Sequence, residues 1–368
     1  MNSAERHRAT YTFKPVDHLV RRELYIWEEA IQRWKNEGLP EDHDQAEVFS
    51  FDPDGIANVG LNLGWCEPPF VPAYEDKVIK NEGHTEIIQD FAGRWLRVFT
   101  GRRHGFMPEY LKHPVTCMKD WVEEVQPRLD ANDQRRYEEL DAKCASAAEA
   151  VERDGRMVSQ GMVGAYMYLR ALMGPEDLLY AFVDQPDLIH AMVRHWATLM
   201  NTGIEKVQSK IQLDELSIGE DICYNHGLLI SPDMVREFIL PHYQEVVGKA
   251  RGRQDGHIYF SVDTDGWCVP AIPLYLEAGM DIMTPFEVAS GCDVVEIGRQ
   301  YPELVMFGGI DKRVLATGKE AIDKHLEYII PAMVERGGYT PTCDHGVPDN
   351  VSFESYMHYR KRICELDH

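Results

Sequence analysis

From about residue 157 onward, short apolar runs alternate with longer segments in which apolar residues recur at helical spacing. The apolar runs predict six strands, at 157–164, 215–219, 257–262, 280–284, 304–309 and 339–343. The segments between and after them predict helices at 186–210, 232–248, 267–278, 291–300, 318–336 and 351–366. Regular alternation of strand and helix is typical of a parallel sheet covered by helices.

The first third of the chain has a weaker pattern. Apolar residues at helical spacing predict a helix over 15–36, inside an N-terminal helical extension that we place at 1–45. The run 48–51 predicts a first strand, and another near 95–99 brings the strand–helix units to about eight. Residues 60–115 are rich in glycine, proline and aromatic residues, and predict a long loop that acts as a lid or binding loop.

Length and composition agree with one large α/β domain. The chain has 368 residues, of which 44% are hydrophobic, and we find no linker, internal repeat or low-complexity segment in it. We therefore predict a single (β/α)8 TIM barrel domain that spans residues 1–368.

Charge and cysteine usage exclude several kinds of partner. The 38 basic and 61 acidic residues give a net charge of −23, which argues against nucleic acid or an anionic membrane as a partner. No apolar stretch approaches the roughly 20 residues of a spanning helix, and the N-terminus lacks the apolar segment of a signal peptide. The eight cysteines have no CxxC spacing, so we expect neither a disulfide framework nor a zinc ribbon. We expect a cytoplasmic protein.

Polar and mostly acidic residues stand where the predicted strands end. They are Glu220 and Asp221, Asp263 and Asp265, Glu287, Asp311, and the run Cys343, Asp344 and His345. Because the carboxyl ends of barrel strands converge on one face, these side chains predict a functional site there.

The paired acids each allow two interpretations. Neighbouring strand residues point in opposite directions, so only one of Glu220 and Asp221 should face the pocket. The other would cap a helix or pair with an arginine such as Arg236. Asp263 and Asp265 point to the same side and can grip one cation or polar group, whereas the alternative is an Asx-turn with Asp265 as a helix cap.

Other residues near the strand ends offer ligands and stacking surfaces. Cys343, Asp344 and His345 supply sulfur, oxygen and nitrogen donors, from which a tetrahedral zinc site can be built. Trp65 and Tyr224 offer apolar surface to a planar ligand, although aromatic residues in loops more often pack a lid.

Some signals favour a structural explanation, and some motifs are absent. We interpret Asp311 as a helix cap or a partner of Arg313, and Arg102-Arg103-His104 as a solvated basic turn. The chain has no GxxxxGK[ST], no GxSxG, no HExxH and no strand followed by GxGxxG. A nucleotide cradle and a serine nucleophile are therefore unsupported, and acid–base or metal chemistry is favoured.

From about Gly161 to its C-terminus the chain resembles the uroporphyrinogen decarboxylase superfamily. The motifs are EDICYN at 220–225, LISPDMVREFILPHY at 229–243, DTDG at 263–266, FGGIDKR at 307–313 and GGYTPTCDHGVP at 337–348. The resemblance implies a (β/α)8 barrel with one of two activities, decarboxylation of uroporphyrinogen or methyl transfer that involves a corrinoid.

The resemblance favours the methyltransferases. The decarboxylases carry an arginine-rich segment near the N-terminus that receives an octa-anionic substrate, and residues 1–50 contain nothing similar. The zinc-bearing methyltransferases place a His-x-Cys pair and a further Cys at strand ends, which this alignment sets against Asp263, Asp265 and Cys343. Carboxylates in place of imidazole and thiolate would make that site harder and weaker for zinc, with Glu220 or His345 as a fourth ligand.

Our hypothesis from the sequence is a corrinoid-dependent methyltransferase. It moves a methyl group from a small donor, an aryl methyl ether, to cob(I)alamin on a separate corrinoid protein, and zinc is a second candidate cofactor. We predict catalytic roles for Glu220, Asp221 and His345, zinc binding by the three residues aligned above, and contact with the methyl donor by Trp65, Tyr224, Asn225, Glu287 and Asp344. The alternatives are a decarboxylase or lyase acting on a carboxylated substrate, and a non-enzymatic tetrapyrrole-binding protein. A homodimer is one option for the assembly.

Overall fold

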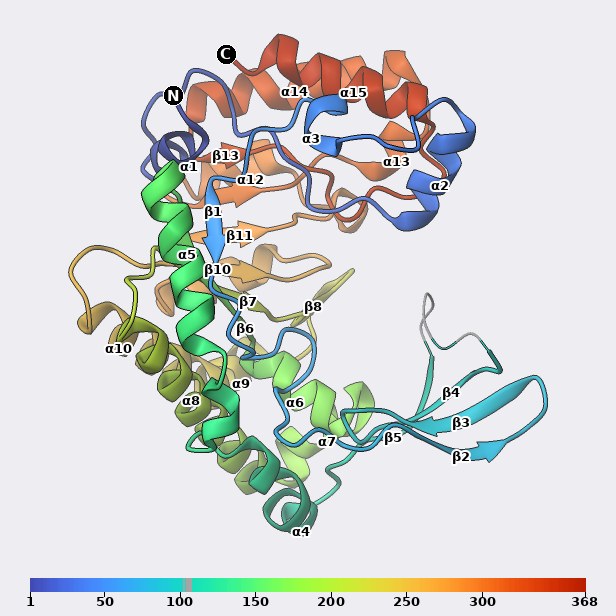
Figure 1. The fold of residues 1–368 in the computed structure, drawn as a ribbon, viewed down its shortest axis with the longest axis vertical. Helices are drawn as coiled ribbons and strands as arrows, with labels where there is room; N and C mark the ends of the chain where they lie inside the picture. Colours follow the sequence, from blue (N-terminus) through green and yellow to red (C-terminus); the bar gives the residue numbers. More distant parts are fainter. Residues whose placement is uncertain (102, 104–107) are drawn as a thin grey trace.

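The computed structural model describes residues 1–101, 103 and 108–368, and its centre is a parallel sheet (Figure 1). The sheet has seven strands in the order β1-β6-β7-β10-β11-β12-β13. They are β1 (Ile56–Asn58), β6 (Met157–Val163), β7 (Glu215–Gly219), β10 (Tyr259–Asp263), β11 (Ile282–Thr284), β12 (Val305–Phe307) and β13 (Tyr339–Thr340). The six strands predicted from residue 157 onward are confirmed, and every pairing is parallel.

The sheet is curled, with β1 and β13 at its two edges. Single parallel bridges extend it beyond β12 and β13, joining Ile26 to Val347 and Ile310 to Cys343. Within the described residues, the edge strands β1 and β13 do not pair with each other, and no further strand of the sheet connects them. The α/β class is therefore confirmed, whereas closure into an eight-stranded barrel stays a prediction.

Helices follow the strands and cover the outer face of the sheet (Figure 1). The α-helices of the first half are α1 (Ser3–Tyr11), α2 (Glu28–Asn36), α3 (Gln45–Val48), α4 (Met118–Asp120), α5 (Leu140–Asp154), α6 (Ala165–Met173) and α7 (Pro175–Asp184). Those of the second half are α8 (Pro186–Gln208), α9 (Pro232–Met234), α10 (Leu240–Gly252), α11 (Ile272–Glu277), α12 (Val294–Gln300), α13 (Lys312–Leu315), α14 (Lys319–Arg336) and α15 (Phe353–Leu366). Short π-helices at Trp121–Val125 and Val235–Ile239 precede a 3-10 turn and α10.

The helix ends follow the local sequence. Pro186 occupies the first turn of α8, where its missing N–H is not needed. Ser352 caps α15 by accepting from Ser355 N–H, and Gly337 (φ +76°) ends α14. Asp311 caps α13, with 2.8 Å to Arg313 N–H, and also pairs with the Arg313 guanidinium. The structural interpretation of Asp311 was therefore correct.

The concave face of the sheet changes from apolar to polar along the strands. Its lowest layer is apolar, because Met157, Ile282 and Val305 pack with Tyr11 of α1. Two residues further along each strand the side chains point the same way again. There the sheet carries small hydroxyl groups and a carboxylate, from Ser159, Ser217, Ser261, Thr284 and Asp263. These side chains are too small to fill the interior, so a cavity remains.

The N-terminal segment differs from its prediction. Only Glu28–Asn36 of the predicted helix 15–36 is helical, whereas α1 forms earlier, behind a capping box of Asn2 and Glu5. The predicted strand 48–51 is wrong, because α3 occupies Gln45–Val48 and is capped by Asp44.

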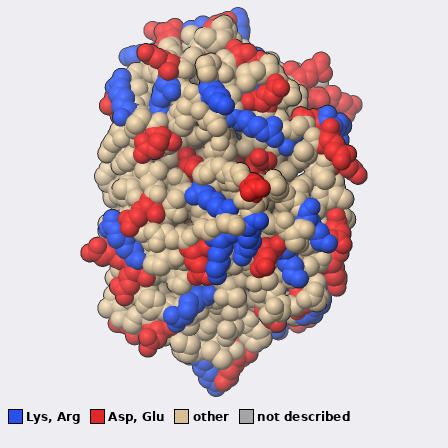
Figure 2. Space-filling view, turned by 90° about the vertical axis from the view of Figure 1, so that its left-hand side faces the viewer, with Lys and Arg blue, Asp and Glu red and all other residues tan. Residues whose placement is uncertain are grey.

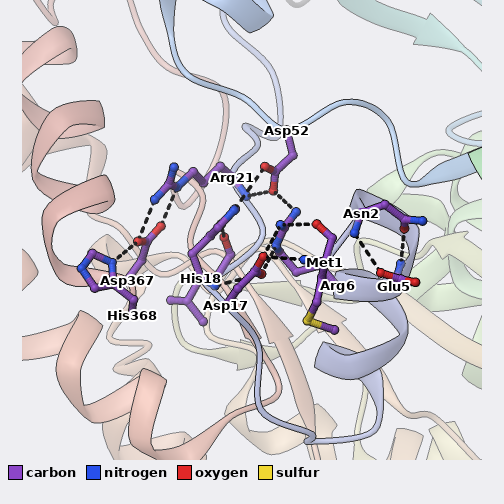
Figure 3. Close-up of polar contacts among 11 residues, drawn as sticks. Met1, Asn2, Glu5, Arg6, Asp17, His18, Arg21, Asp52, Asp367 and His368 are labelled. Atoms are coloured by element: carbon purple, nitrogen blue, oxygen red, sulfur yellow. Dashed lines mark hydrogen bonds and ion pairs between the residues drawn. The ribbon is translucent and has the colours of Figure 1, made fainter.

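Ion pairs help to hold residues 12–27 in an irregular, non-helical conformation. Arg6 reaches both Asp17 (2.9 Å) and Asp52 (3.1 Å), and Arg21 pairs with Asp367 at 2.7 Å (Figure 3). These partners come from segments that are remote in sequence. Residues 15–27 have helical periodicity, but these contacts, which only the folded chain provides, outweigh the local helical preference.

Residues 60–115 do not form the long loop that we predicted. They contain an antiparallel sheet of β2 (Lys77–Asn81), β3 (Thr85–Gln89), β4 (Trp95–Phe99) and β5 (Glu109–Lys112). This sheet, which we call the arm, projects from the body of the molecule (Figure 1). The strand predicted near 95–99 is present but belongs to the arm. Arg102 and His104 lie outside the described residues.

The surface carries charges of both signs. On the face shown in Figure 2, acidic and basic side chains are interspersed rather than segregated. A search of the described helices found none with the length and apolarity needed to cross a bilayer.

Candidate active site

The carboxyl ends of β7, β10 and β13 bring four titratable side chains together. Asp263 ends β10, Asp221 and Asp265 follow β7 and β10, and His345 follows β13. His345 Nε2 lies 3.5 Å from Asp265 Oδ2, and the Asp265 N–H donates to Asp221 Oδ1 at 3.5 Å. We call Asp221, Asp263, Asp265 and His345 the acid cluster. It joins residues more than one hundred positions apart in the sequence.

Two further side chains hold the acid cluster in place. Arg170 of α6 lies 3.5 Å from Asp221 Oδ2, and the Tyr25 hydroxyl lies 2.8 Å from His345 Nδ1. Asp221 itself has a left-handed backbone (φ +40°), an uncommon conformation for a residue with a Cβ. Arg170 and Tyr25 were not predicted from the sequence, because neither stands at a strand end.

Burial and neighbouring charges raise the pKa values of two carboxyl groups of the cluster, Asp221 and Asp263. Burial raises the pKa of Asp263 to about 7, with help from the charges of Asp265 and Asp221. Burial, and then Asp265, also raises the pKa of Asp221. Asp263 is therefore a carboxylic acid that holds its proton close to neutral pH, which is the property of a general acid.

His345 provides a direct test of this electrostatic arrangement. Its hydrogen bond to Asp265 raises the pKa of His345, whereas burial opposes the rise. We expect Asp265→Asn to lower the pKa of His345, as measured by NMR titration of the imidazole protons. The pair stabilises the fold below the imidazole's ordinary pKa, and that stability is lost as pH rises through the folded value. An unchanged His345 titration in the variant would contradict the contact.

Glu220 points away from the acid cluster. Its carboxylate is completely buried and accepts from Tyr166 N–H at 3.1 Å, at the N-terminus of α6, and from the Tyr275 hydroxyl. A Cβ on Gly164 would overlap this carboxylate, so the glycine makes room for it. Glu220 thus occupies the position of a helix cap supplied from a neighbouring strand. Arg236, the alternative partner, instead lies 3.3 Å from Glu277.

Asp344 and Glu287 connect neighbouring loops. The Asp344 carboxylate is buried and accepts from Val288 N–H (2.9 Å) and Lys312 N–H (3.1 Å). Glu287 accepts from Gly266 N–H at 3.0 Å and from Lys312 Nζ at 3.1 Å. Both carboxylates therefore have local partners, and each is linked to the acid cluster, Glu287 through the neighbour of Asp265 and Asp344 as the neighbour of His345.

Several aromatic side chains lie near the carboxyl ends of the strands, around the acid cluster. Trp65 and Tyr224 are 41% and 44% exposed, which leaves ring surface free for a ligand. Tyr224 belongs to a hairpin of β8 (Cys223–Tyr224) and β9 (Gly227–Leu228), and Asn225 lies exposed in its turn. Tyr25 and Trp27 flank His345, with a Trp27–His345 ring separation of 6.4 Å.

Gly161 of β6 and Gly219 of β7 lie against the Trp65 indole. A Cβ on Gly219 would lie 3.0 Å from the indole and 3.1 Å from the Trp65 carbonyl, which is too close. We expect Gly219→Ala to displace Trp65, change its fluorescence and weaken binding of aromatic ligands. Gly161→Ala is the matched control, because its Cβ would lie 3.6 Å from the same ring, at ordinary contact distance. Equal effects of the two variants would contradict this packing.

A cavity of about 570 Å³ lies inside the curled sheet. Trp65 and Asp263 line it near the strand ends, and Tyr11 and Glu215 line it toward α1. Pockets for small molecules commonly have this size. The sequence analysis found the polar strand ends but not the hydroxyl-lined interior, because single serines within apolar runs carry no distinctive signal.

A family model described as uroporphyrinogen decarboxylase (URO-D) matches residues 106–365. The chain belongs to the URO-D family. The match includes all four residues of the acid cluster and agrees with the resemblance found in the motifs. A comparison with curated proteins found no match.

One solved structure shares the fold over nearly the whole chain. A methyltransferase from Methanosarcina mazei superposes with a TM-score of 0.63 over 99% of both chains, at 13% sequence identity. A chain assigned as a vitamin B12-independent methionine synthase, from Listeria monocytogenes, has a TM-score of 0.34 at 13% identity, covering 60% of this chain and 67% of that one. At these identities the first match shows a shared fold, and the second is too distant to add to it.

Two thiols near the acid cluster are protonated. Burial and nearby carboxylates raise the pKa of Cys66 to about 11 and hold that of Cys343 well above its usual range. Neither cysteine is therefore an activated nucleophile. Cys66 was not among the predicted site residues, although it directly follows Trp65.

The predicted zinc ligands do not assemble into a zinc site. Within the described residues, no group of three or more His, Cys, Asp or Glu side chains is arranged to hold a metal ion. Cys343 is completely buried beside Glu23, whose carboxylate accepts from Cys343 N–H at 2.6 Å, whereas Asp265 is 40% exposed. As arranged, these side chains do not fit a zinc ion.

Proposed function

We propose that this URO-D family member is a methyltransferase that moves a methyl group from an aryl methyl ether to the cobalt of a corrinoid on a partner protein. The observation that carries the proposal is Asp263, an acid with a pKa of about 7 that lines the cavity. The thiols near it are protonated and unsuited to attack on carbon. A cavity lined by a proton donor, with the Cys66 and Cys343 thiols protonated, suits a reaction whose nucleophile comes from the second substrate.

In the proposed reaction the methyl carbon passes from the ether oxygen to the acceptor. The carbon–oxygen bond breaks, cob(I)alamin supplies the electron pair of the new carbon–cobalt bond, and the oxygen leaves with the old pair. Asp263 delivers its proton to this oxygen, so the product is a neutral phenol. Burial, and then the charges of Asp265 and Asp221, raise the pKa of Asp263 and so favour its protonated form, and His345 balances the charge of Asp265.

The roles of the surrounding residues follow from their positions. Trp65 and Tyr224 would stack on the aromatic donor, and Asn225 and Glu287 would contact it at the rim. Glu220 and Asp344 would act as positioning residues, since both are buried against backbone N–H groups. The structural neighbour from Methanosarcina mazei is a methyltransferase, which is consistent with the proposal.

The decisive experiment incubates purified protein with cob(I)alamin and a panel of methoxylated aromatic compounds and methylamines. Formation of methylcobalamin is followed by absorbance, with the metal content measured on the same sample and a protein-free reaction as control. We expect methylation from methoxylated aromatic compounds. The proposal fails if no donor methylates cobalt. Release of carbon dioxide from a carboxylated substrate would instead support a decarboxylase that uses the same acids.

A further inference from the structure

The cavity extends from the acid cluster toward α1, and a cationic side chain lines it at that end. Arg22 lines the same cavity as Asp263, together with His7, Tyr11 and Glu215. Its charge acts on His7, Tyr11 and Glu215, which places the guanidinium toward α1. This arginine lies outside the segment matched by the family model.

Arg22 differs from the arginines around it. Arg6 and Arg21 are occupied by ion pairs with carboxylates of the N- and C-terminal segments (Figure 3). In the part of the chain that the structure describes, the Arg22 guanidinium makes no hydrogen bond or ion pair. A half-buried guanidinium without a partner has five donors available, in a planar arrangement that matches a carboxylate.

Other groups in the cavity are also left without partners. His7 is 3% exposed and its Nδ1 has no hydrogen-bond partner, and Thr284 is 8% exposed with a free hydroxyl. Burial, and then the charge of Arg22, lowers the pKa of His7 to about 3, so its imidazole is neutral. Buried polar atoms are normally satisfied, and these two line the same cavity as Arg22, which indicates a polar ligand.

The carboxyl group of Glu215 does not neutralise Arg22. Glu215 accepts from the Tyr11 hydroxyl at 2.6 Å and is completely enclosed in the sheet interior. Burial raises the pKa of Glu215, and the hydrogen bond from Tyr11 and the charge of Arg22 oppose the rise. Within the described residues no hydrogen bond or ion pair joins Glu215 to the Arg22 guanidinium, so its N–H donors remain available to a ligand.

We propose that the deep end of the cavity is a carboxylate subsite, in which Arg22 binds the acid group of the substrate while Asp263 faces its ether oxygen. The proposal rests on the proposed function for the position of the ether. It names the substrate class as methoxylated aromatic carboxylates. The aromatic ring would span the hydroxyl-lined interior between the two ends.

The test measures binding alone, by calorimetry, for a methoxybenzoate and the corresponding methoxybenzamide. We expect the wild type to prefer the benzoate by about tenfold or more, because a hydrogen bond to a charged group is lost with the amide. Arg22→Gln should abolish this preference and leave amide binding unchanged. Arg22→Lys should keep part of it, since the ammonium retains charge without the planar fork. Arg299→Gln, which removes an exposed charge away from the cavity, should behave like the wild type.

Each outcome decides the proposal. It is wrong if the wild type binds neither ligand or both equally, or if Arg22→Gln retains the preference. Should that variant fail to fold, as judged by circular dichroism, an undiminished preference in Arg22→Lys would contradict the proposal, and a reduced one would support it. The assay contains no cobalamin. Specific binding without methyl transfer would therefore disprove the proposed function while the carboxylate subsite stands.

Discussion

Methyl transfer is expected to fall about a hundredfold to ten-thousandfold when Asp263 is replaced by Asn. Asparagine keeps the shape of the side chain but has no acidic proton to give to the leaving oxygen. The measurement is kcat for methylcobalamin formation with a saturating methoxylated donor. Binding of the donor should change much less than kcat, because the proton is needed only as the carbon–oxygen bond breaks.

The pH profile gives the same prediction a second readout. Asp263 acts in its protonated form and its pKa is about 7, so activity should be full below that pH and fall above it. In Asp265→Asn, one of the charges that raise this pKa is absent, and the fall should move to lower pH. A wild-type activity profile that is flat through neutral pH, or an active Asp263→Asn enzyme, would show that Asp263 is not the proton donor.

The second large effect concerns stability. We expect Glu220→Ala to lower the free energy of unfolding by about 3 kcal/mol. The substitution leaves Tyr166 N–H and the Tyr275 hydroxyl in the core without their hydrogen-bond acceptor. Urea denaturation would measure the change. Asp221→Ala is the matched control one residue away, and its partly exposed side chain should cost less than about 1 kcal/mol.

Glu220 also makes a pH-dependent contribution with a definite sign. Burial raises its pKa to about 8, so the folded state holds a proton that the unfolded chain has released above its ordinary pKa. Stability should therefore fall as pH rises from the unfolded value toward about 8. In Glu220→Gln this dependence should be weaker. A stable but inactive Glu220→Ala protein would instead support the catalytic role predicted from sequence.

The strand-end acids illustrate how far sequence reasoning reached. We expected one of Glu220 and Asp221 to face the pocket, because adjacent strand residues point in opposite directions. β7 instead ends at Gly219, and Asp221 has a left-handed backbone, so the alternation of a strand does not apply to this pair. The structure places Asp221 in the acid cluster and Glu220 beneath α6. Local sequence could not make this choice, because it depends on where the N-terminus of α6 lies. Asp263 was predicted as a zinc ligand. Its burial raises its pKa to about 7, which favours a role as a proton donor instead.

The arm and the N-terminal segment show where the sequence signal failed. The strands of the arm are five residues or fewer and separated by polar turns, so glycine, proline and aromatic content suggested a loop. Residues 12–27 have helical periodicity, yet their charged side chains pair with Asp52 and Asp367. Periodicity reports a local preference, and a few ion pairs and packing contacts can outweigh it.

By itself the sequence determined the parallel strand order from β6 to β13, the membership of the URO-D family and the edge of the sheet that carries the acids. These features are local, since each strand and its terminal acid lie within a few adjacent residues. Only the tertiary structure decided which acids meet, that Asp263 holds its proton, and that Arg22 lies in the same cavity. Burial and charge proximity set these properties, and both depend on segments that folding brings together from distant parts of the chain.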